Sequence, residues 1–271
     1  MIKAKKLAQI IARPITDKVL KLKNTYRGES CYIFGDGISI KWMNLSLLPR
    51  RPSFTLSCIP FHSQSRDLDI RFALLIEPWY FYPIFPMPVG SPYKWWRNRI
   101  NTLYTEFSAS NPHTNIFINI SNYPFFRGRN VFHLFRKIND PGFQFMSQCL
   151  ENDVEPFEGS LTTSITLAIF MGFKEIMLVG CDYTHGYSRS LHWYEIGQGV
   201  LTDNDDYLRD FFEIASKYVK IETLALDSAS SVLKAISYES YTGYSPSYRE
   251  NHELIERKAL KLLKTWPGYA I

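Results

Sequence analysis

Short apolar runs alternate along this chain with longer amphipathic stretches. The runs are bounded by Gly, Pro or polar clusters, as buried strands are, and they lie at residues 31–34, 54–58, 71–76, 115–119, 175–179 and 221–226. Apolar residues recur at helical spacing at about 160–171 and about 204–218. Strands that alternate with helices predict an α/β fold. We expect a single Rossmann-like domain whose mostly parallel sheet is covered on both faces.

The region from Glu77 to Trp96 fits neither pattern. Prolines at positions 78, 83, 86, 88 and 92 interrupt it. Proline breaks helices and cannot donate a hydrogen bond in a central strand. The sequence therefore predicts an ordered, aromatic-rich loop here.

Both ends of the chain are basic and amphipathic. Apolar residues at helical spacing alternate with lysines in residues 1–27, and Pro14 predicts a break in that helix. The segment from Asn251 to Thr265 repeats the pattern. Two interpretations stay open for both helices: packing on the domain edge, and binding to an anionic lipid surface. We divide the chain into an N-terminal helix at 1–27, the Rossmann-like domain at 28–240 with a lid-like loop at about 184–206, and a C-terminal basic helix at 241–271.

Composition and charge narrow the class of protein. The chain has 271 residues, 45% hydrophobic and 21% charged, which suits one folded domain and excludes disordered and fibrous classes. The net charge of +5 is modest, and the first 27 residues carry more than the whole excess, with eight lysine and arginine residues against one aspartate. We expect this basic end to meet an anionic inner-membrane surface and expect no nucleic acid partner.

Cysteine usage and hydropathy bear on location. The cysteines at 31, 58, 149 and 181 are far apart, and most lie in apolar runs, so neither a disulfide framework nor a zinc ribbon is predicted. No signal peptide or membrane-spanning stretch is apparent. We expect a cytoplasmic protein, soluble or peripheral on the inner membrane, that can form a homo-oligomer.

Candidate ligand-binding residues follow the first and fifth apolar runs. Gly35-Asp36-Gly37-Ile38-Ser39 follows one, and Gly180-Cys181-Asp182-Tyr183 follows the other. Ligands of parallel sheets bind at the carboxyl ends of strands, where the strand order reverses. Glycines allow backbone N–H groups to approach a phosphate, but a plain turn explains them equally well, and the dinucleotide and P-loop fingerprints are incomplete.

Two further patterns carry possible chemistry. The run from Glu158 to Ser164 places small hydroxyl residues before a helix, which suits a phosphate or a carboxylate, although N-capping alone needs one of them. An aspartate such as Asp182 can bind a ribose or acceptor hydroxyl. His185 and His192 have the pKa range of a general base, although a loop histidine is more often a plain surface residue.

Acidic pairs raise the question of a metal. Asp67-Leu-Asp69 and Asp203-Asn-Asp205 have the spacing that other sugar-nucleotide enzymes use to bind a divalent ion. Neither pair closely follows a predicted sheet strand. We therefore predict no metal site.

Two blocks of sequence resemble a known group of enzymes. The segment at 22–63 carries a lysine-rich lead, a strand, a Gly-x-Gly-x-Ser turn and a Leu-Pro step to a second strand. It resembles the opening of the bacterial lipooligosaccharide sialyltransferases and of the related small DUF115/MptE-like glycosyltransferases. The segment at 159–183 resembles their second hallmark, with a Ser-containing helix, Gly-Phe-Lys-Glu-Ile, a strand and Gly-Cys-Asp-Tyr.

The resemblance implies a function. It implies an inverting glycosyltransferase of lipopolysaccharide biosynthesis that moves sialic acid or a related ulosonic acid from a CMP-sugar donor to a cell-surface glycan or lipooligosaccharide acceptor. No cofactor would be required, because the monophosphate leaving group is already stable. The implied reaction is a displacement in which positioning and charge stabilisation supply most of the catalysis.

The resemblance also implies roles for named residues. Those that would bind the nucleotide or the nucleotide sugar are Gly35, Asp36, Gly37, Ser39, Glu77, Ser160 and Asp182. His192 would act as the base, with His185 as the other candidate. Tyr183 and Tyr194 would donate hydrogen bonds to the departing phosphate, and Tyr187 is a further candidate.

The chain departs from the group at two positions, which leaves alternatives open. Asp36 replaces the Asn of Gly-Asn-Gly and adds a negative charge near a phosphate, and Ile59-Pro60 replaces another Asn. One alternative is a pterin diphosphokinase-like phosphotransferase that depends on ATP and magnesium. Another is a catalytically inactive, membrane-associated nucleotide-binding scaffold.

Overall fold

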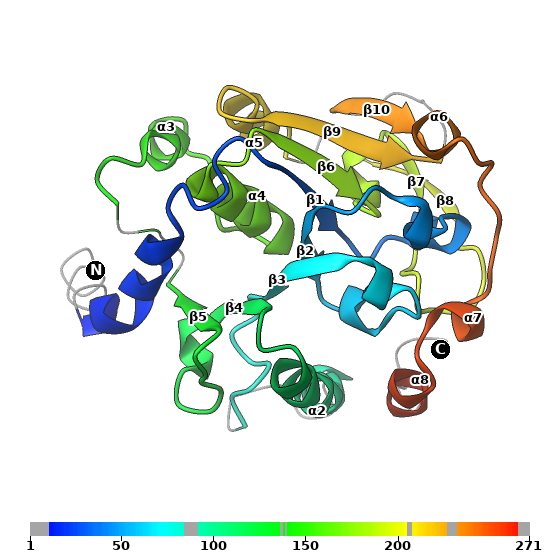
Figure 1. Ribbon diagram of the computed structural model, residues 1–271, viewed down its shortest axis with the longest axis horizontal. Coiled ribbons are helices and arrows are strands. Elements are labelled where there is room, and N and C mark those ends of the chain that lie inside the picture. The colour runs from blue at the N-terminus through cyan, green and yellow to red at the C-terminus, as the bar shows by residue number, and fades with distance from the viewer. Residues whose placement is uncertain are drawn as a thin grey trace.

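The computed structural model describes residues 11–83, 92–135, 138, 140–204, 208–226 and 232–264. Its centre is an eight-stranded sheet with the order β10-β9-β6-β1-β2-β3-β4-β5 (Figure 1). Every neighbouring pair in this sheet is parallel. The strands are β1 (Ser30–Phe34), β2 (Pro52–Leu56), β3 (Asp69–Leu75), β4 (Asn115–Asn119), β5 (Val131–Leu134), β6 (Glu175–Val179), β9 (Lys220–Ala225) and β10 (Lys234–Ser237). The predicted α/β fold with a parallel sheet is confirmed.

Helices cover both faces of the sheet (Figure 1). They are α2 (Pro92–Ser110), α3 (Gln144–Glu151), α4 (Ser160–Met171), α5 (Arg209–Ala215), α6 (Tyr238–Thr242), α7 (Asn251–Leu254) and α8 (Arg257–Leu263). Alternate side chains of most strands enter two separate cores. In β1, Tyr32 and Phe34 pack with α2 and α8, whereas Cys31 and Ile33 pack with α3, α4 and α5. Burial on both faces explains why the strand runs are almost wholly apolar.

The order of the strands reverses between β1 and β6. From β1 the chain proceeds outward through β2, β3 and β4 to β5, then returns through α4 to β6 on the other side of β1. The carboxyl ends of these two neighbours therefore flank the crevice where ligands of open α/β sheets bind. The turn after each of them holds the candidate residues identified from the sequence.

Both outermost strands were missed by the sequence pattern. β5 has the sequence VFHL, which is too short to stand out as an apolar run, and β10 has the sequence KAIS, which is both short and partly polar. The edge at β5 is covered by Lys18, whose ammonium donates to the backbone oxygens of Gly128, Arg129 and Val131 at 3.2, 2.6 and 2.7 Å. A lysine at an exposed edge discourages pairing with other chains.

The prediction of a loop over residues 77–96 is wrong for its last residues, which are helical. α2 begins at Pro92 and runs to Ser110. Proline is well suited to the first turn of a helix, where its missing N–H would have had no partner. The prolines at 86 and 88 lie outside the described residues.

The two terminal helices also differ from their predictions. Residues 11–16 are α-helical through Pro14, and the change to a 3₁₀ helix, η1, comes at Asp17–Leu22, while residues 1–10 lie outside the described part. The predicted helix from Asn251 is interrupted at Ile255, which forms a β-bridge with His62 and separates α7 from α8. Within the described ranges, no helix is both long enough and apolar enough to cross a bilayer.

Candidate functional site

The turn after β1 lies directly against the turn after β6. The Gly35 N–H donates to Val179 O and the Gly37 N–H donates to Gly180 O, both at 2.8 Å. A Cβ on Gly35 would lie 2.4 Å from Gly180 O, and a Cβ on Gly37 would lie 2.4 Å from Asp182 Cγ. Glycine is required at both positions because any side chain would collide with the neighbouring turn. The structure therefore brings together the two segments that the sequence singled out.

Asp182 joins the two turns. Its carboxylate accepts a hydrogen bond from the Ser39 N–H at 2.9 Å and another from the Ser39 hydroxyl at 2.5 Å. Asp182 is 5% exposed, and burial raises its pKa even though the Ser39 hydrogen bonds and the nearby histidines act to lower it. Carboxylate oxygens have lone pairs beyond the two that Ser39 uses, so the group can still accept from a bound hydroxyl.

The carboxylate of Asp36 makes its hydrogen bonds within the protein. It accepts from the Cys58 N–H at 3.2 Å and from Trp193 Nε1 at 3.1 Å. Burial raises the pKa of Asp36 to about 6, against the lowering effect of His192 and of these hydrogen bonds. The negative charge expected at this position is thus met by hydrogen-bond donors, and the raised pKa lets the carboxylate take up a proton below about pH 6.

His192 lies over the same turn. Residues 184–204, here called the His192 loop, include a short antiparallel ribbon of β7 (Tyr187–Arg189) and β8 (Leu201–Asp203). The backbone of His192 forms an antiparallel β-bridge with Gly37, and the Trp193 N–H donates to Asp36 O at 3.1 Å. Trp193 is fully buried and anchors the loop against the turn after β1.

Glu195 orients the His192 ring. Its Oε2 accepts from the His192 backbone N–H and contacts ring Nδ1, each at 2.7 Å. Because an ionised carboxylate only accepts, Nδ1 carries the proton and Nε2 is the basic nitrogen. Burial lowers the pKa of His192, but the Glu195 hydrogen bond and the charges of Asp36, Glu195 and Asp182 outweigh it, so that the pKa is raised. A histidine oriented by a carboxylate has the arrangement of a general base.

A cavity of 260 Å³ opens beside this cluster at the carboxyl ends of β6 and β9. Its lining includes Ser39, Asp182, His185, Tyr187, Arg189 and Trp42. His185 Nε2 lies 3.2 Å from Thr223 Oγ1, and the Arg189 guanidinium lies 5.9 Å from the Trp42 ring centre. Aromatic rings with hydroxyl, carboxylate and guanidinium groups form a lining suited to a sugar or a nucleotide.

The tyrosines predicted to act on the departing phosphate are placed differently from one another. Tyr183 is 55% exposed at the end of β6, and Tyr187 is 68% exposed on β7. Tyr194 is buried, with its ring stacked on His192 at a centroid distance of 5.0 Å. Tyr194 thus packs against one face of the His192 ring.

The hydroxyl run at the start of α4 is largely engaged with the backbone of the same helical turn, and only Thr162 caps a backbone N–H, that of Gly159 at 3.0 Å. Thr162 and Thr163 donate to Gly159 O at 3.1 and 2.7 Å, and Ser164 donates to Leu161 O at 2.7 Å. These side chains are therefore engaged with backbone oxygens. Ser160 is half-buried at the first position of α4, at the sheet edge that also holds the turn after β1.

Glu77 lines a separate, smaller cavity of 70 Å³ with Glu158, Asn119 and Thr163. It follows β3 and is exposed. The presence of a second carboxylate, Glu158, makes this cavity unfavourable for a phosphate. The nucleotide-binding role implied for Glu77 thus has no electrostatic support.

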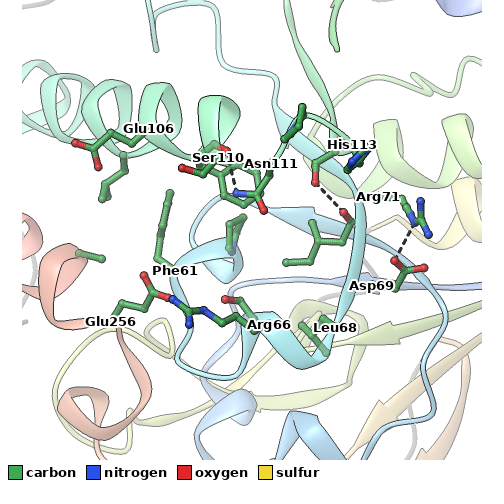
Figure 2. Close-up of a pocket in the computed structure, with 18 of the residues that line it drawn as sticks. Phe61, Arg66, Leu68, Asp69, Arg71, Glu106, Ser110, Asn111, His113 and Glu256 are labelled. Carbon is green, nitrogen blue, oxygen red and sulfur yellow. Dashed lines mark hydrogen bonds and ion pairs between the residues drawn. The ribbon is translucent and has the colours of Figure 1, made fainter. Parts of the chain in front are cut away.

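A larger cavity of 720 Å³ lies at the opposite edge of the sheet, where β3 and β4 begin (Figure 2). Figure 2 shows charged side chains of both signs around it, including Arg66, Glu256 and the ion pair of Arg71 with Asp69 at 2.8 Å. The acidic pair of Asp67 and Asp69 belongs to this edge, remote from the glycine turns. Asp203 is exposed on β8, and Asp205 lies outside the described residues. The described residues contain no group of three or more metal-ligating side chains.

Sequence inspection assigned no role to Glu195 or Trp193, although both stand beside His192. A His and a Glu three positions apart in a polar loop are a detectable signal for an oriented histidine. The partner of the Trp193 indole, Asp36, could not be inferred, because the two residues are 157 positions apart in the chain.

Comparisons with known proteins give one structural likeness. No family model matches the chain, and no curated protein matches its sequence. Among solved structures, the sialyltransferase CstII from Campylobacter jejuni, in complex with the substrate analogue cytidine-5'-monophosphate, superposes with a TM-score of 0.42 and 12% identity. The match covers 89% of this chain and 99% of that one.

Proposed function

We propose that this protein is an inverting glycosyltransferase that transfers an acidic sugar from a CMP-sugar to a hydroxyl group of a glycan. The observation that carries the proposal is the meeting of the Gly35–Gly37 turn, Asp182 and the His192–Glu195 pair where the strand order reverses. This site combines an oriented base with the sheet edge at which open α/β folds bind their ligands. The two sequence blocks that resemble lipooligosaccharide sialyltransferases support the same proposal.

The proposed reaction is a single displacement. Nε2 of His192 takes the proton of an acceptor hydroxyl while the oxygen of that hydroxyl attacks the anomeric carbon of the donor. The bond between the anomeric carbon and the phosphate oxygen breaks, and CMP leaves from the opposite face. Glu195 stabilises the imidazolium that forms, since its carboxylate stays hydrogen-bonded to Nδ1.

The remaining groups position the substrates. We assign Asp182 and Ser39 to hydroxyls of the ribose or of the acceptor, and the cavity with Trp42, Tyr187 and Arg189 to the sugar end of the donor. Arg189 supplies a positive charge that suits the carboxylate of sialic acid or of a related ulosonic acid. The acceptor class that we propose is a cell-surface glycan or lipooligosaccharide.

The test offers the purified protein CMP-sialic acid or CMP-Kdo with desialylated lipooligosaccharide as acceptor and, separately, ATP with a hydroxymethyl pterin as acceptor, each with Mg²⁺ and with EDTA. Release of CMP or AMP is measured by chromatography. We expect release of CMP from a CMP-sugar, undiminished in EDTA.

Variants identify the base. His192→Ala should abolish CMP release while the circular dichroism spectrum is unchanged, and His185→Ala tests the other candidate. His113→Ala, an exposed histidine at the opposite sheet edge, is the matched control. Turnover of ATP with magnesium would favour the phosphotransferase. Binding of CMP without turnover of any donor would favour the inactive scaffold, and either result would reject the proposal.

A further inference from the structure

A segment from the far end of the chain lies along the His192 loop. Residues 247–255, here called the C-terminal strap, include α7, and their first part runs beside η2 (Ile38–Trp42), the 3₁₀ helix that follows the glycine turn. The Ser247 N–H donates to Trp42 O at 3.0 Å, and the Arg249 N–H donates to Lys41 O at 2.9 Å. The strap is therefore attached to the element that carries Ser39.

Lys41 and Glu250 connect the strap to the loop. The Lys41 side chain is fully buried, and its ammonium lies 2.5 Å from Glu250 Oε1 and 2.6 Å from Gly197 O. The same carboxylate accepts from the Gly197 N–H at 3.2 Å. Both backbone groups of Gly197 are thus bound by one ion pair, whose lysine is fully buried and whose glutamate is half-buried.

Asn251 makes a second attachment nearer to His192. Its Nδ2 donates to Tyr194 O at 2.9 Å, and Asn251 is 3% exposed. Tyr194 is the residue whose ring stacks on His192. Attachments on the strap therefore bind the loop at Tyr194 and at Gly197, on both sides of Glu195.

A buried ion pair is weak evidence for stability, because the cost of removing both charges from water offsets their attraction. Such a pair can still fix the positions of the groups around it when its remaining hydrogen bonds are satisfied. Here the carboxylate also accepts from Tyr248 and from the Asn251 N–H, both at 2.8 Å. Burial opposes ionisation, but the hydrogen bonds from Lys41, Asn251 and Tyr248 outweigh it and lower the pKa of Glu250 to about 2.

We propose that Glu250 and Asn251 are positioning residues for proton transfer, which hold the Tyr194–Gly197 backbone so that Glu195 and His192 face the glycine turn. This inference rests on the function proposed above. The C-terminal strap would thus be a part of the active site, although it follows the last strand of the sheet. Small displacements of a positioned base reduce the rate of the chemical step more than they weaken substrate binding.

The test uses the full chain with Glu250→Gln and, separately, Asn251→Ala. The control is Glu106→Gln. Glu106 on α2 forms an ion pair with the exposed Lys258 on α8, so this variant also removes an ion pair of the C-terminal part of the chain. Hydrogen exchange of backbone amides is measured by NMR together with kcat and KM for the donor.

The decisive amides are those of His192 and Trp193, because neither touches Glu250 directly. They donate to Glu195 and to Asp36. We expect both strap variants to raise their exchange rates about tenfold without changing exchange in the central strands. We also expect kcat to fall about tenfold with KM within about twofold. The control should match the wild type.

Faster exchange at Gly197 alone, or an unchanged kcat with loosened His192 and Trp193 amides, would overturn the inference. If Glu250→Gln does not fold, Asn251→Ala decides the question, since it removes a single hydrogen bond and leaves the ion pair. If the wild type turns over no donor, the proposed transferase fails. The positioning claim is then judged by an NMR titration of the His192 ring. The pKa read from this titration must change in the strap variants and not in the control.

Discussion

Glu195 binds His192 at two points, the backbone N–H and ring Nδ1, each at 2.7 Å from the same carboxylate oxygen. The two residues stand three positions apart, and Trp193 between them is fully buried. A loop anchored in this way holds the ring in one tautomer and one orientation. The Glu195 contact that leaves Nε2 as the basic nitrogen is local in sequence, whereas the loop that carries both residues is attached to distant segments at Asp36 and Asn251.

Glu195→Gln should shift the pH profile. His192 acts as a base only when neutral, so kcat should rise as pH increases through its pKa, which the Glu195 carboxylate raises. Removal of that charge lowers the pKa, and the acidic limb should therefore move to lower pH. The plateau should fall roughly 10²-fold, because the imidazolium loses its stabilising partner. Measurement of kcat from pH 5 to 9 checks both effects. An acidic limb that stays in place would contradict the assignment of His192 as the base.

Gly35→Ala and Gly37→Ala should each destabilise the fold. The added methyl group would lie 2.4 Å from Gly180 O or from Asp182 Cγ, and the adjoining turns must separate to accept it. Overpacking of this kind costs roughly 1–3 kcal/mol of unfolding free energy. Urea denaturation provides the measurement. Gly142→Ala is the control, because its nearest described atom would be at an ordinary 3.5 Å. Equal stability of all three variants would refute this account of the turn.

The meeting of these turns could be predicted from the sequence, whereas the direction of Asp36 could not. Parallel strands bring their carboxyl ends to one edge, so the residues after β1 and β6 had to share it. The Asp36 carboxylate is directed by the Cys58 N–H and the Trp193 indole, and no local pattern indicates that either group contacts Asp36. The same limit applies to the strap, since Glu250 meets Lys41 across 209 positions.

Local chemistry also explains the errors at the ends of elements. Pro92 was interpreted as a helix breaker, yet at the first residue of α2 it begins the helix. The apolar pattern after Asn251 continues through Ile255, but a β-bridge to His62 uses the Ile255 backbone and ends α7. Periodicity identified which residues are buried in these segments, and tertiary contacts determined where the helices stop.

Asp36→Asn should stabilise the protein at alkaline pH. The folded-state pKa of Asp36 is about 6, above its ordinary 3.8, because burial disfavours the charge. As pH rises from about 4 to 7, the unfolded chain releases this proton first, and the folded state loses roughly 2 kcal/mol. The amide is neutral throughout and its oxygen can accept from Trp193 and Cys58 as the carboxylate does. The variant should therefore exceed the wild type in unfolding free energy at pH 8 and match it at pH 4.

The exposed Asp203 provides the control for that comparison, as Asp203→Asn. Its stability relative to the wild type should not vary with pH in the same way. An Asp36→Asn protein less stable than the wild type at pH 8 would show that the ionised carboxylate is needed for the Trp193 and Cys58 contacts.

Ser39→Ala tests the connection between the two turns. The Ser39 hydroxyl donates to Asp182 at 2.5 Å, and a hydrogen bond to an ionised, buried carboxylate contributes roughly 1.5–3 kcal/mol. Its loss should raise the pKa of Asp182 further, since the hydroxyl is among the groups that lower it. The deficit in unfolding free energy should thus be largest at high pH and should shrink as pH falls and Asp182 takes up a proton in both proteins. Ser39→Thr keeps the hydroxyl and should retain most of the stability. A deficit that is independent of pH would mean that the Asp182 charge is not what the Ser39 hydroxyl stabilises.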